Sequence, residues 1–225
     1  MKKTALFLVV VFLMIGACGC SMRGQDKIDR MISYINNKYT DDHFAFVEMS
    51  GGHMGSNVTK IVVESNKYPG KEIRVICSEV EGEEIYTDTY LNVKFEEQTY
   101  DYIRETLIKK YGDNIYLEYV PDDIACIEAG SSSTTFKEYI SDPNVYIYFS
   151  AVVGDEVNDE NAVFAEIKEL FSDSVLRAHI YFVDTEEEIA NNAQLFIKNK
   201  TYSKELYFVK NTVDEYKTVE WTDGV

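Results

Sequence analysis

The sequence predicts an α+β fold, with mainly antiparallel or mixed sheets and helices packed on one face. Short segments in which apolar and polar residues alternate, typical of half-buried strands, recur along the chain. Between them lie segments whose apolar residues recur every three or four positions, as in amphipathic helices. A polar stretch over 121–135 separates two such series, so the folded part, 26–225, is open to a subdivision into similar-sized parts over 26–120 and 136–225.

The first series begins with a helix, because Ile28, Met31, Ile32 and Ile35 recur at helical spacing. A second helix carries apolar residues from Tyr100 to Tyr111, and Gly112 is expected to end it. Strands are expected over 43–49, 59–65, 72–80, 85–95 and 114–120. Together these elements predict one mostly antiparallel sheet with helices on one side.

The second series alternates helices with strands. A short helix is expected to end at Ile140, and apolar residues from Val163 to Phe171 predict another. Thr185 is expected to cap a third helix, since three glutamates follow it and acidic residues favour a helix start. Strands are expected over 145–153, 175–183, 205–209 and 215–221, the last two as a hairpin.

The start of the chain has the layout of a secretory signal. Lys2 and Lys3 form a positive cluster, an unbroken apolar run follows over 5–15, and two small residues come after it. The run is too short to cross a bilayer, which takes about 20 apolar residues. The layout therefore predicts export rather than a membrane-spanning helix.

An aliphatic residue, two small residues and a cysteine then follow, in the order Ile15-Gly16-Ala17-Cys18. This stretch resembles the lipobox of bacterial lipoproteins, and the mature chain resembles small lipoproteins of this kind. The resemblance implies that a signal peptide over 1–17 is removed and that the Cys18 thiol carries a diacylglyceryl group, with Cys20 as the alternative. It further implies that 18–25 tether the folded part to the extracytoplasmic side of the cell membrane. Two acyl chains give a stable attachment, whereas one chain holds only marginally.

Composition narrows the classes of partner. The formal net charge is −17, whereas phosphate binding depends on clustered lysines and arginines, so nucleic acid is not expected as a partner. The chain also has 17 tyrosines and 12 phenylalanines. Aromatic rings with polar tips suit a recognition surface, although their preference for strands explains many of them equally well.

The most suggestive local feature is a glycine-rich loop that contains Gly51, Gly52, His53 and Gly55. Its backbone amides could hold an anionic ligand. The competing interpretation is a plain hairpin connection, because no Gly-Lys-Ser/Thr follows and the loop joins two apparent strands. His179 lies in an apolar strand segment and is expected to be a partly buried strand histidine.

The sequence contains no motif for a metal, a cofactor or a catalytic group, and none of these is predicted. Whether Cys77 and Cys126 form a disulfide is left open, because export permits it and apolar surroundings suit free thiols.

The first hypothesis is a non-enzymatic, membrane-anchored lipoprotein that binds a protein or a small ligand. The alternatives are a hydrolase with a dispersed active site, for which His53 and His179 are the first suspects, and the solute-binding component of a transporter.

Overall fold

The computed structural model describes residues 24–51, 57–121, 130–142, 144–145, 147–154, 157–172, 175–184, 188–210 and 216–224. It confirms the α+β fold class, with one sheet of four strands and one of five. The chain divides into two compact units, of which the first ends at Asp88 and the second begins at Thr89. This division lies upstream of the polar stretch over 121–135.

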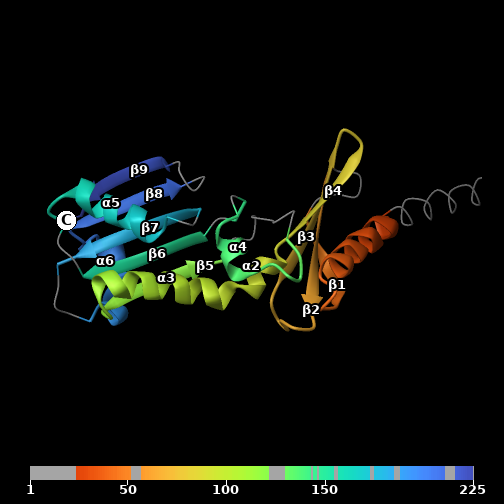
Figure 1. Ribbon diagram of the computed structural model, residues 1–225, viewed down its shortest axis with the longest axis horizontal. Helices are drawn as coiled ribbons and strands as arrows, with labels where there is room; N and C mark the ends of the chain where they lie inside the picture. Colours follow the sequence, from red (N-terminus) through yellow and green to blue (C-terminus); the bar gives the residue numbers. More distant parts are fainter. Residues whose placement is uncertain are drawn as a thin grey trace, which may run out of the picture. The chain divides into compact units, whose positions relative to one another are not determined.

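The first unit consists of a helix, described over 24–38, and an antiparallel sheet in the order β1-β2-β3-β4 (Figure 1). The strands are β1 (Phe44–Gly51), β2 (Val58–Ser65), β3 (Ile73–Val80) and β4 (Glu83–Asp88). Glu81 and Gly82 alone join β3 to β4, with φ of 54° and 85°. Positive φ at both positions is what a two-residue hairpin turn requires, and glycine adopts it without strain.

The helix packs on one face of this sheet through the residues that sequence spacing predicts. Met31, Ile35 and Tyr39 are fully buried, as are alternate residues of β2 and β3 such as Ile61 and Val75. A buried ion pair joins the helix to β4, with the Lys38 ammonium 2.7 Å from the Asp88 carboxylate. The hydroxyls of Tyr34 and Tyr39 also donate to that carboxylate, each at 3.0 Å.

The predicted long strand over 85–95 is wrong in its second half. β4 ends at Asp88, and helix α2 (Tyr90–Lys94) follows at once. The tyrosine, leucine and valine of this stretch favour a strand locally. Burial of Leu91 and Phe95, one helical turn apart, outweighs that preference.

The second unit holds the five-stranded sheet, in the order β5-β6-β7-β8-β9 (Figure 1). Only β6 and β7 pair in parallel, and the helix α5 connects them. The elements after α2 are α3 (Glu96–Tyr111), β5 (Ile115–Val120), α4 (Phe136–Ile140), β6 (Ile147–Gly154), α5 (Glu160–Leu170), β7 (Leu176–Val183), α6 (Ile189–Asn199), β8 (Lys204–Lys210) and β9 (Tyr216–Asp223).

The strand predicted over 114–120 therefore belongs to the second sheet rather than to the first. The six residues of β5 pair with β6 across the polar stretch, from Ile115 opposite Val153 to Val120 opposite Tyr148. These backbone hydrogen bonds explain why the division of the chain does not lie within 121–135. The polar stretch is a connection between paired strands, not a joint between units.

Helices cover both faces of the five-stranded sheet, rather than one as predicted. On the first face, Phe149 of β6 contacts Phe171 with ring centroids 5.5 Å apart, and Phe164 of α5 contacts Phe208 of β8 at 6.1 Å. Helix α3 lies on the same face, where Tyr111 contacts Phe182. Helix α6 packs on the opposite face.

The start of α6 differs from the prediction. The helix begins at Ile189 after Glu188, which makes no capping hydrogen bond with its side chain. The amide of Ile189 instead donates to the Asn114 side chain at 2.8 Å, so a residue distant in sequence satisfies a free helix amide. Thr185, the predicted cap, lies outside the described residues and four positions before the helix.

Candidate functional site

The face of the five-stranded sheet that carries α6 has an uncovered part. Side chains alternate between the two faces along each strand. The register therefore places Val120, Tyr148 and Arg177 in one row across β5, β6 and β7. The next row contains Ser150, His179 and Tyr207 on β6, β7 and β8.

Helix α6 covers only the part of this face beyond these two rows. Its residues Ile189 and Ala193 form a buried cluster with Val152, Val183 and Tyr202. Outside the cluster, Tyr148, His179 and Tyr207 are half-buried, Arg177 is exposed, and Val120 is 48% exposed. We name these five uncovered residues the open face.

Arg177 is fixed at the centre of the open face by two tyrosine rings. Its guanidinium carbon lies 5.9 Å from the ring centroid of Tyr148 and 5.5 Å from that of Tyr207. The Nε–H donates to the Tyr207 hydroxyl at 2.9 Å. Within the described part of the chain, no carboxylate forms an ion pair with Arg177, and its two Nη groups make no hydrogen bond there.

His179 is held on the same strand, two positions further on. Its Nδ1 lies 2.9 Å from a carboxylate oxygen of Glu205, and its ring packs against Tyr207 with centroids 4.5 Å apart. The second carboxylate oxygen of Glu205 accepts a hydrogen bond from the Tyr202 hydroxyl at 3.1 Å. Glu205 therefore links the open face to the cluster under α6. The prediction of a partly buried strand histidine is confirmed, with 27% of the side chain exposed.

The charge of Glu205 also affects the neighbouring phenols. Burial, followed by the negative charge of Glu205, raises the pKa of Tyr181 to about 12. Burial and the hydrogen bond to Glu205 raise the pKa of Tyr202 as well. Both phenols are therefore neutral at physiological pH.

The same residues can be compared with those of a catalytic site and with those of a binding surface. A histidine oriented by a carboxylate supplies two of the three members of a hydrolytic triad, which also needs a nucleophile bonded to the other ring nitrogen. Among the described residues, no serine, threonine, tyrosine or cysteine donates a hydrogen bond to His179. Tyrosine and arginine, in contrast, are the residue types that dominate binding energy at protein interfaces.

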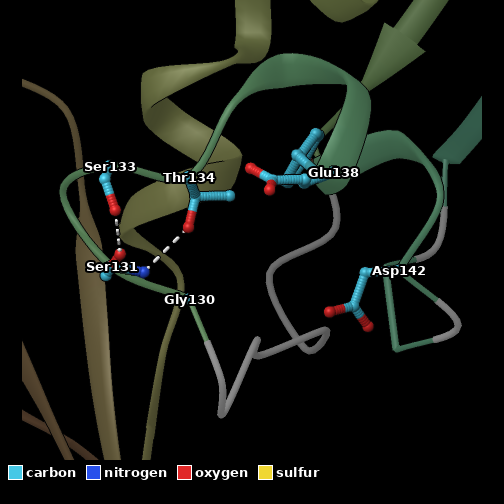
Figure 2. A pocket seen from close by; sticks show the side chains of 7 residues that line it. Gly130, Ser131, Ser133, Thr134, Glu138 and Asp142 are labelled. Carbon is cyan, nitrogen blue, oxygen red and sulfur yellow. Dashed lines mark hydrogen bonds between the residues drawn. The ribbon is translucent and has the colours of Figure 1, made fainter.

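A second candidate is a cavity of about 340 Å³ beside α4, lined by Ser131, Ser133, Thr134, Glu138 and Asp142 among others (Figure 2). Polar groups that line this cavity already form hydrogen bonds with neighbouring residues of the same connection. The Ser131 amide donates to the Thr134 hydroxyl, and Glu138 completes a capping box with Thr135. Asp142 accepts from the Asn144 amide. Several polar groups around the cavity are therefore already bonded within the connection itself.

The loop predicted as a ligand site is only partly visible. Gly51 is the last residue of β1, and Gly52, His53 and Gly55 lie outside the described residues. The lipidation candidates Cys18 and Cys20 also lie outside them, as does Cys126. Cys77 is a buried free thiol, and burial raises its pKa. The structure therefore leaves Cys77 outside any disulfide.

Sequence reasoning missed Arg177 and Tyr207, although one signal for them was present. β7 lies between two other strands, and parallel central strands covered on both sides are apolar throughout. In β7, however, Arg177, His179 and Tyr181 alternate with the buried Ala178 and Ile180. Such alternation in a central strand indicates a face that is not fully covered.

The described part of the chain contains neither a cluster of metal-ligating side chains nor a membrane-spanning helix. No three or more histidine, cysteine, aspartate or glutamate side chains come together there as a metal site would require. In the same residues, no helix is both long and apolar enough to cross a membrane.

Comparison with known proteins leaves the function open. No protein family model matches the chain, and no curated protein is significantly similar to it. A solved structure of a DUF5037 family protein from Ruminococcus gnavus is similar at a TM-score of 0.36 and 11% identity, over 84% of this chain and 93% of that one. A TM-score of this size supports no conclusion about fold or function.

The geometry around Glu205 predicts a measurable titration. In a Glu205→Gln variant, the pKa of Tyr181 should fall below 12, because a negative charge that opposes phenolate formation is gone. It should stay above the ordinary value of about 10, because burial is unchanged. Titration by NMR of the labelled tyrosine ring measures it, with Glu166→Gln on α5 as the control. An unchanged pKa of Tyr181 would contradict the effect of the Glu205 charge on this phenol.

Proposed function

We propose that this protein is an exported lipoprotein, anchored through Cys18 at the extracytoplasmic side of the cell membrane, whose open face binds a protein partner. The proposal joins the lipobox resemblance of Ile15-Gly16-Ala17-Cys18 with the uncovered part of the five-stranded sheet. In this role the protein is a binding module rather than an enzyme.

The binding role rests on the surroundings of Arg177. Several cations of the protein lie within ion-pair distance of carboxylates, such as Arg30 with Glu84 and Lys204 with Glu160. Arg177 instead rests on two tyrosine rings with its Nη groups free, in a chain of net charge −17. Because rotamers held by packing lose little entropy on binding, such a group is suited to a partner.

The anchor is tested by metabolic labelling with a fatty acid in a bacterium that produces the full-length chain. We expect label on the wild type, a marked loss in a Cys18→Ala variant, and none when Cys20→Ala is added. Label that survives in the double variant, or is missing from the wild type, would refute the anchor.

The binding role is tested by photo-crosslinking in intact cells. A benzoylphenylalanine placed at Tyr148 should give a discrete protein adduct on irradiation, because that ring lies on the open face. The matched control is the same substitution at Tyr100, which is 37% exposed on α3 and lies away from the open face. Equal adduct patterns at the two positions, or no adduct at Tyr148, would refute this role.

A further inference from the structure

The open face has a charge pattern that specifies the chemistry of its partner, provided that the proposed binding role holds. Its centre carries the guanidinium of Arg177, with five N–H donors of which only the Nε–H is used within the described residues. The two Nη groups form a planar fork that matches the two oxygens of a carboxylate. The tyrosine rings of Tyr148 and Tyr207 hold this fork in place before any ligand arrives.

Negative charges lie on both sides of this centre. The register places Glu118 of β5 and Glu220 of β9 in the row of His179, each two strands away from it. Strands are about 4.8 Å apart, so each lies roughly 10 Å from His179 along the row. Both glutamates are exposed, and in the described part of the chain neither forms an ion pair.

His179 contributes an acceptor to the same surface. In the neutral imidazole, an Nδ1–H donated to Glu205 leaves the Nε2 atom as an acceptor. The face therefore offers donors at Arg177, and acceptors at His179 and the two flanking glutamates. A polyanion such as nucleic acid would satisfy Arg177 but be repelled by the glutamates.

We propose that the partner is a protein surface that presents one carboxylate to Arg177, with basic side chains around it that meet Glu118 and Glu220. A protein fits better than a small molecule because the two rows lie on an open sheet, whereas small-molecule sites are concave. A basic rim also matches the net charge of −17, which attracts such a surface at long range.

The test uses four synthetic pentapeptides and the full-length protein. Each peptide has a tyrosine on either side of its central residue, which is glutamate or glutamine, and either lysine or serine at both ends. Dissociation constants come from NMR titration. We expect the glutamate peptide with lysine ends to bind most tightly, and its glutamine counterpart to bind about tenfold or more weakly, as a lost charged hydrogen bond implies.

Three variants show which residues cause the preference among the four peptides. Arg177→Gln should remove the preference for glutamate over glutamine, whereas Arg104→Gln, an exposed arginine on α3, should keep it. Glu118→Gln combined with Glu220→Gln should remove the preference for lysine ends. Circular dichroism confirms that each variant folds.

Equal binding of the glutamate and glutamine peptides would overturn the proposed chemistry, as would an unchanged preference in Arg177→Gln or no binding by any of the four. None of these results affects the crosslink at Tyr148. An adduct at Tyr148 together with no peptide preference would therefore leave the binding role standing and remove only its charge pattern.

Discussion

Helices cover the two faces of the five-stranded sheet to different extents, and the proposed binding surface depends on this difference. Two helices, α3 and α5, cover one face, where Phe149, Ile180, Phe182 and Phe208 are fully enclosed. Among the described residues, α6 is the one helix on the other face, and its 11 residues span about 16 Å. The eight residues of β7 alone extend over about 26 Å. Part of each central strand therefore meets solvent, and its side chains are polar or aromatic for that reason.

Charged side chains are stabilised differently in the two units. In the first unit, the buried Asp88 carboxylate is satisfied by Lys38 and two tyrosine hydroxyls. An unpaired charge in such a place costs about 3–5 kcal/mol, so the network holds the helix on its sheet. Arg177 is fixed without a carboxylate, and the two rings that hold it are themselves part of the open face. The open face therefore holds Arg177 in place and leaves its Nη groups available for a partner.

Sequence reasoning succeeded where one buried stripe determines an element. Ile103 and Leu107 predicted α3, and the alternation of Ile73, Val75 and Cys77 predicted β3. It failed where the outcome depends on distant partners. The pairing of β5 with β6 and the helical turn at Leu91 both follow from tertiary contacts that no local window contains. The open face was missed for the same reason, because its exposure depends on the short length of α6.

The most direct test of the central claim is whether His179 is covered in the cell. Diethyl pyrocarbonate modifies accessible histidines, and the exposed His43 of the first unit serves as the internal reference. We predict that the ratio of modification at His179 to that at His43 is several-fold lower in intact cells than in the purified full-length protein. The same ratio in both preparations would contradict the claim that the open face binds a partner.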